Sequence, residues 1–159
     1  MSWALVRLDD RLLHGQVAVG WAGKLHPRRI VVADDRLAAS TWEREMVESA
    51  APDGVEVRIV PVDGVAGLPP GDTEDAFLLL RGPLELARLL RAGARLPEVN
   101  VGGLHTAAGK HRVLDYFYAD AADAAALREA AATGCRLFAQ DVPGNPVEDV
   151  LALLGRAGL

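Results

Sequence analysis

Residue types that can handle a phosphoryl group are crowded into one short stretch of this chain. Two carboxylates, Asp9 and Asp10, end an alternating apolar run, and Arg11, His14 and Gly15 follow directly. Imidazole is the side chain that is partly neutral, and therefore nucleophilic, near neutral pH. A guanidinium beside it offers a planar fork of donors to phosphate oxygens. The stretch therefore suits a histidine that receives a phosphoryl group.

The residues around His14 could assist such a transfer. The sequence predicts a strand-to-helix turn, at which the backbone N–H groups of Gly15 and Gln16 open a helix and favour an anion. Gly15 lacks a Cβ and lets the backbone come close. Because phosphoryl transfer asks mainly for positioning and charge stabilisation, we predict catalytic roles for His14 and Arg11 and phosphate contacts from Gly15 and Gln16. The alternative is that His14 is a surface or capping histidine.

The two carboxylates need a separate explanation, because a negative charge repels a phosphohistidine. One of them could accept a hydrogen bond from Arg11 or from a ring nitrogen of His14 and so orient it. Alternatively, Asp9 and Asp10 only end the strand. We assign neither as a general base, and we place Asp10 among the residues predicted to border the phosphate.

Arg81 and a glycine-rich segment are further candidates. Arg81 follows the most apolar run of the chain and could reach the same crevice, or it could be an exposed arginine at a strand end. Residues 102–110 are basic and Gly-rich but lack the spacing of a P-loop. His105 and His111 have no cysteine or carboxylate cluster close in sequence, so we predict no metal and no cofactor. Residues 34–35 fit a helix cap better than a magnesium site.

Composition excludes several classes of function. The chain has 159 residues with a formal net charge of −5, and hydrophobic residues make up 50%, enough for a sizeable core. We expect one domain, residues 1–159, without the basic face of a nucleic-acid binder. Cys135 is the single cysteine, which excludes an internal disulfide and fits a reducing cytosol. No apolar run reaches the ~20 residues of a membrane helix and no signal peptide is evident, so a cytoplasmic protein is expected.

Strand-like and helix-like segments alternate along the sequence. Strands are predicted at residues 2–8, 29–33, 55–62, 76–80, 98–101, 113–119 and 136–142, and helices at 16–24, 37–51, 83–92, 120–133 and 147–156. This alternation predicts an α/β fold with a mostly parallel central sheet and helices on both faces. Ligands of such sheets gather outside the carboxyl ends of the strands. The segments expected to line the site are therefore 9–15, 34–35, 81–82 and 102–110.

Several segments resemble the IIB components of mannose/fructose/sorbose-type sugar phosphotransferase systems. The matching segments are residues 8–17, 29–35, 51–55, 99–105 and 109–110. The resemblance extends from about Leu5 to about Leu154 and is loosest after Lys110, at residues 115–118. At 81–83 the chain reads Arg-Gly-Pro, where many members carry Thr-Asn-Pro or Lys-Asn-Pro.

The resemblance implies a phosphotransferase that needs no cofactor. Family members accept a phosphoryl group on Nδ1 of one histidine from a phosphorylated IIA protein or domain. They then pass it to a sugar held by the membrane components IIC and IID, which keep them at the inner face of the cell membrane. The matching histidine is His14 and the matching arginine is Arg11, while Gly15 and Gln16 match loop residues beside the phosphate. The cationic variants of the family make a phosphate contact from Arg81 reasonable.

Other interpretations remain open at this point. The same residues would serve a regulatory phosphohistidine module of an incomplete system, which does not itself transport sugar. A nucleotide-binding domain is disfavoured because the chain has no P-loop and no dinucleotide fingerprint. An apolar helix face could support a homodimer. The sugar cannot be read from this chain, because its recognition resides largely in the membrane partner.

Overall fold

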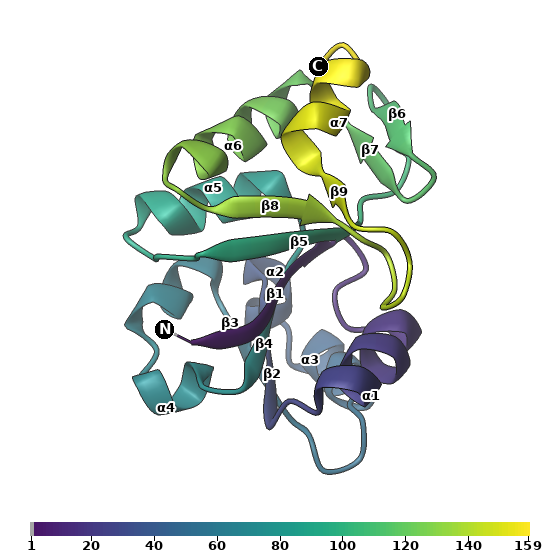
Figure 1. Cartoon of the computed structure of the whole chain (residues 1–159). Coiled ribbons are helices and arrows are strands. Elements are labelled where there is room, and N and C mark those ends of the chain that lie inside the picture. Colours follow the sequence, from purple (N-terminus) through teal and green to yellow (C-terminus); the bar gives the residue numbers. More distant parts are fainter. Residues whose placement is uncertain (1) are drawn as a thin grey trace.

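A seven-stranded sheet forms the middle of the computed structural model, which describes residues 2–159 (Figure 1). In spatial order its strands are β3 (Glu56–Val60), β2 (Arg29–Ala33), β4 (Ala76–Leu80), β1 (Trp3–Asp9), β5 (Glu98–Gly103), β8 (Arg136–Ala139) and β9 (Glu148–Asp149). Neighbouring strands run parallel, except that β9 pairs antiparallel with β8. The predicted α/β fold with a mostly parallel sheet is therefore confirmed.

Helices cover both faces of the sheet, as predicted. They are the π-helical segment η1 (Gln16–Trp21), α1 (Ala22–Leu25), α2 (Asp35–Ala39), α3 (Thr41–Glu48), the 3-10 segment η2 (Val62–Gly67), α4 (Pro70–Thr73), α5 (Pro83–Arg91), α6 (Ala121–Ala132) and α7 (Val150–Arg156). One apolar core lies between the sheet and α5, α6 and α7, and a second lies under η1, α1 and α2. The separate hairpin of β6 (His111–Leu114) and β7 (Phe117–Ala119) packs against the first core.

The central strands form because their sequences suit burial on both faces. Every residue of β4 is buried, and so are Leu5 to Asp9 of β1. Continuous apolar runs are typical of strands in the middle of a parallel sheet. Because β1 lies between β4 and β5, its carboxyl end opens at the centre of the sheet edge, where ligand sites of this architecture form.

The structure differs from several of the predicted elements. The helix predicted at 37–51 is two helices, because Ser40 is extended and its hydroxyl accepts a hydrogen bond from the Glu43 N–H, which starts α3. The strand predicted at 113–119 is the β6–β7 hairpin. The strand predicted at 98–101 is longer in the structure and reaches Gly103. The strand predicted at 136–142 is shorter and ends at Ala139. The last helix begins only at Val150, after β9.

No helix within residues 2–159 is long and apolar enough to cross a membrane.

Candidate active site

The loop that follows β1 holds the histidine at the sheet edge. Its turn is closed by a hydrogen bond from the Leu12 N–H to the Asp9 carbonyl, at 2.9 Å. Leu12 has a φ of 57°, in the left-handed region that costs a non-glycine residue energy. The side chains of Leu12 and Leu13 are buried in the second core, and this burial offsets the strain. The two leucines therefore anchor the loop and leave His14 at the surface of the crevice.

His14 is held by one hydrogen bond to a buried carboxylate. Its Nε2 lies 2.8 Å from Oδ2 of Asp9, and the His14 side chain is 16% exposed while that of Asp9 is 0% exposed. A carboxylate only accepts hydrogen bonds, so the neutral ring must donate from Nε2–H. The lone pair is then on Nδ1, the nitrogen that Asp9 leaves free. The structure thus favours the Nε2–H tautomer of the neutral ring.

A buried arginine holds Asp9 in turn. Arg7 Nη2 donates to Asp9 Oδ2 at 2.9 Å, and Arg7 is also fully buried. Burial alone would raise the pKa of Asp9, but the hydrogen bond from His14 and the charge of Arg7 outweigh it and lower that pKa. Asp9 is therefore ionised at neutral pH, and the positive charge of Arg7 offsets its negative charge.

Two glycines of β5 make room for this ion pair. The pairing of β1 with β5 shifts register between Leu8 and Asp9, so that Asp9 pairs with Gly103. A Cβ on Gly102 would lie 1.9 Å from Arg7 Cζ, and a Cβ on Gly103 would lie 2.9 Å from Asp9 Oδ2. The Gly102-Gly103 pair is therefore a packing requirement of the site.

Arg11 lies on the open side of Asp9. Its backbone N–H donates to Asp9 Oδ1 at 3.1 Å, and its guanidinium reaches Gln16 Oε1 at 3.2 Å. Arg11 Nε lies 3.8 Å from Asp9 Oδ1, and the Arg11 side chain is 45% exposed, so an incoming anion can reach its guanidinium. The space beside Gly15 is open, and the first helical hydrogen bond after it runs from the Ala18 N–H to the His14 carbonyl. The structure thus brings His14, Arg11, Gly15 and Gln16 together.

Asp10 and Arg81 have different partners from those of His14. Both carboxylate oxygens of Asp10 bind His105, one through the backbone N–H and one through Nδ1, each at 2.6 Å. Arg81 Nε donates to Asp34 at 2.7 Å, and Arg81 Nη1 donates to the Asp10 carbonyl at 3.1 Å. Asp34 also caps α2, as predicted. A phosphate contact from Asp10 or Arg81 stays a prediction, and both residues hold loops of the crevice in place.

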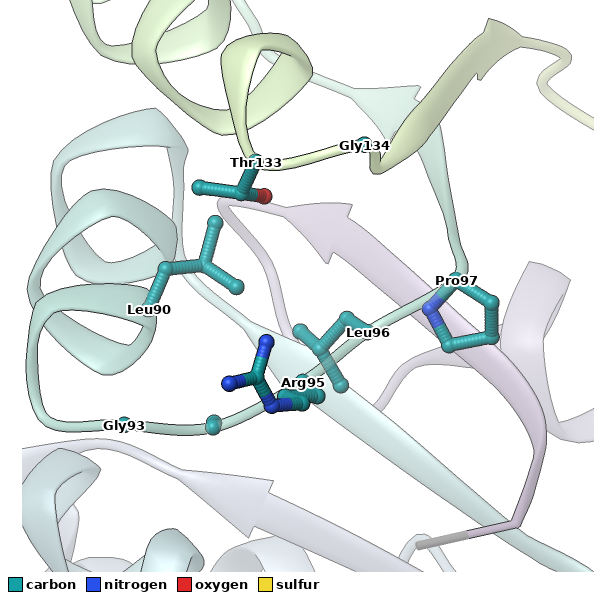
Figure 2. A pocket seen from close by; sticks show the side chains of 8 residues that line it. Leu90, Gly93, Arg95, Leu96, Pro97, Thr133 and Gly134 are labelled. Atoms are coloured by element: carbon teal, nitrogen blue, oxygen red, sulfur yellow. The ribbon is translucent and has the colours of Figure 1, made fainter.

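Neither of two hollows in the protein surface is lined by His14. A hollow of about 330 Å³ between the ends of α5 and α6 lies before the first residues of β5 and β8, at the end of the sheet opposite His14 (Figure 2). A smaller one of about 220 Å³ adjoins the site and is lined by Asp10, Arg81 and His105 among others. Within residues 2–159 no group of His, Cys, Asp and Glu side chains is arranged to hold a metal ion.

Arg7 and Asn100 are the functional candidates that the predicted site residues do not include. Asp9, for which the sequence left two roles open, is the carboxylate that orients the imidazole. A positive charge inside a strand that is buried on both faces was the available signal for Arg7, because such a charge requires a partner.

Comparisons with known proteins agree with this architecture. The family described as "PTS system sorbose subfamily IIB component" matches residues 3–159. The chain is 33% identical over 155 residues to the sorbose-specific EIIB component of Lacticaseibacillus casei, covering 96% of this chain and 94% of that one. It is 32% identical over 159 residues to the mannose-specific EIIAB component of Escherichia coli (strain K12), covering 98% of this chain and 49% of the relative.

A solved structure gives the same result. The IIBSor domain of the sorbose permease from Klebsiella pneumoniae superposes with a TM-score of 0.89 at 28% identity, and 98% of each chain is covered. The resemblance found in the sequence is therefore confirmed. The chain belongs to the sorbose/mannose family of IIB components, the phosphocarrier enzymes of sugar phosphotransferase systems.

Proposed function

We propose that this IIB component carries its phosphoryl group on Nδ1 of His14. The observation that carries the proposal is the 2.8 Å contact between His14 Nε2 and the buried carboxylate of Asp9. This contact fixes the ring and, in the neutral imidazole, leaves the lone pair on Nδ1. A histidine without a role would not need a buried, ionised acceptor for one of its ring nitrogens.

The transfer follows from this tautomer. The Nδ1 lone pair attacks phosphorus and an N–P bond forms, while the N–P bond of the donor phosphohistidine breaks and its electron pair returns to the donor ring. The His14 ring becomes positive but keeps its Nε2 proton, which stays hydrogen-bonded to Asp9. In the next step a sugar hydroxyl attacks phosphorus, the N–P bond breaks, and the hydroxyl proton leaves to solvent or to a base of the partner. Alignment of donor and acceptor supplies most of the catalysis.

Arg11 supplies charge stabilisation in this proposal. Its exposed guanidinium can leave Gln16 and grip the equatorial oxygens of the phosphoryl group with two parallel hydrogen bonds. Gly15 and Gln16 border the group through their backbone N–H groups. The group must be released again, so these contacts need to be stronger in the transition state than in the phosphorylated protein.

The partners are proposed from the family. The donor is a phosphorylated IIA protein or domain, and the name of the Escherichia coli relative, EIIAB, agrees with a close link between the two components. The acceptor is a sugar held by IIC and IID at the cytoplasmic face of the membrane. The curated relatives act on different sugars by their names, sorbose and mannose, so no particular sugar is assigned to this chain.

Phosphotransfer from a phosphorylated IIA protein tests the proposal. The wild-type chain should acquire a phosphoryl group that is lost in acid and kept in base, as a phosphoramidate is. His14→Ala should acquire none, and the matched control His111→Ala, which changes an exposed histidine in β6, should be labelled normally. Normal labelling of His14→Ala would overturn the assignment.

A further inference from the structure

A buried network of hydrogen bonds links Asn100 to His14 through Arg7 and Asp9. Arg7 and Asn100 lie opposite each other in the register of β1 and β5, and both are fully buried. Arg7 Nη1 donates to Asn100 Oδ1 at 2.7 Å, on the other side of the guanidinium from Asp9. The guanidinium therefore lies between an ionised acceptor that holds the imidazole and a neutral acceptor from the next strand.

The chemistry of position 100 is specific. Arg7 Nη1 and Asn100 Nδ2 both donate to the Gln140 carbonyl, at 3.2 Å and 3.0 Å. The residue at position 100 must therefore accept from Arg7 and donate to a carbonyl at once, which one amide orientation achieves. A carboxylate there would lose the second bond and compete with Asp9 for the arginine. Because the amide of Asn100 is neutral, Asp9 is the carboxylate that pairs with the positive charge of Arg7.

Other groups border the Arg7 guanidinium. Its Cζ lies 5.6 Å from the centre of the Trp21 ring, and the Trp21 indole N–H donates to the Asp141 carbonyl at 2.9 Å. The Cβ that Gly102 lacks would lie in the space that the guanidinium occupies. The connection after β8, which runs beside the first helical segment in Figure 1, thus helps to hold the arginine.

We propose that Asn100 is a positioning residue for phosphoryl acceptance, acting through Arg7 and Asp9 on the tautomer and orientation of His14. The inference rests on the proposed function, in which His14 Nδ1 is the acceptor. Without Asn100, Arg7 Nη1 loses its 2.7 Å bond and keeps only the 3.2 Å bond to the Gln140 carbonyl, so the guanidinium shifts toward that oxygen. Asp9 then moves with it, and the hydrogen bond that selects the Nε2–H tautomer weakens. A misplacement of about 1 Å can cost up to about 10²-fold in rate, so a partial shift should cost about tenfold.

Two variants and one control separate this role from a loss of stability. Asn100→Ala removes both hydrogen bonds, and Asn100→Leu removes them while keeping the volume of the side chain. Thr73→Val is the control, because Thr73 is also fully buried and its hydroxyl donates one hydrogen bond, to the Pro70 carbonyl at 3.0 Å, away from the site. All three should lower the unfolding temperature.

Two measurements on the full-length chain read out the role. The ¹⁵N NMR signature of the His14 ring should show the Nε2–H tautomer in the wild type and in Thr73→Val, with more Nδ1–H in both Asn100 variants. Phosphorylation by potassium phosphoramidate, a donor that needs no partner protein, should be about tenfold slower in the Asn100 variants only. Folded Asn100 variants with the wild-type signature and rate would overturn the inference.

A further measurement needs no variant and so does not depend on folding. In the wild type the side-chain protons of Arg7 and Asn100 should exchange with water as slowly as buried backbone amides do, and rapid exchange would overturn the inference. His14→Ala separates the two proposals. Phosphorylation that persists in His14→Ala removes the proposed function, whereas its loss there beside wild-type behaviour of the Asn100 variants removes only the role of Asn100.

Discussion

Replacing Gly102 with alanine forces a choice between the backbone of β5 and the guanidinium of Arg7. The new Cβ would lie 1.9 Å from Arg7 Cζ and Nη1, and both strands are fixed by their neighbours. If Arg7 yields, Asp9 loses its buried partner, and breaking such a pair costs about 3–5 kcal/mol. For a chain of this length each kcal/mol lowers the melting temperature by about 2–4 °C, so we expect a drop of about 6–20 °C.

Calorimetry or thermal denaturation followed by circular dichroism measures this drop. The matched control is Gly155→Ala in α7, where nothing lies within 4 Å of the added Cβ. Alanine is the better helix former by about 0.5–1 kcal/mol, so this variant should melt at the wild-type temperature or slightly above it. Gly102→Ala should therefore lower the melting temperature, whereas Gly155→Ala should not. Gly102→Ala melting within about 2 °C of the wild type would refute the packing argument, since that is the effect of less than about 1 kcal/mol.

Three further predictions concern other parts of the molecule. Arg11→Lys should slow phosphorylation by a IIA donor about tenfold, because a point charge replaces a two-pronged contact, and an unchanged rate would count against Arg11. Burial alone would raise the pKa of Asp9, but His14 and Arg7 lower it. The ionised Asp9 therefore stabilises the fold at pH values above its unfolded pKa of about 3.9. This stabilisation is lost as the pH falls through the lower pKa of Asp9 in the folded chain. Urea midpoints should therefore decline below about pH 4, less steeply in Asp9→Asn, and equal slopes would contradict this. Burial, with the charge of Glu98, raises the pKa of the Cys135 thiol to about 11, so a disulfide reagent at pH 8 should label the unfolded chain only, and rapid labelling of the folded chain would contradict this.

Local sequence was enough to predict some elements of the fold. The predicted strands at 29–33 and 76–80 match β2 and β4 residue for residue, because each is a continuous apolar run bounded by polar or turn residues. The break at Ser40 was missed since the residues on both sides favour helix. Ser40 followed three residues later by Glu43 is a capping pattern that could have located it.

The site could be predicted only as far as its residues are close in sequence. His14, Arg11 and Gly15 belong to one loop, so their spacing alone brings them together. Asn100, the second partner of Arg7, is 93 residues away, and this contact depends on the register of β1 against β5, which one strand does not reveal. Which of the two carboxylates, Asp9 or Asp10, contacts His14 likewise depends on where each side chain points in the folded chain. Asp9 lies under the histidine that follows it, whereas Asp10 binds His105 on the next strand's loop.

The nitrogen that carries the phosphoryl group tests the central claim most directly. The chain labelled with ¹⁵N in its histidines would be phosphorylated by a IIA donor and examined by ¹⁵N and ³¹P NMR. The account predicts a single phosphorylated ring, that of His14, with phosphorus bonded to Nδ1 and the proton kept on Nε2 beside Asp9. Phosphorus on Nε2, or on a ring other than that of His14, would contradict it.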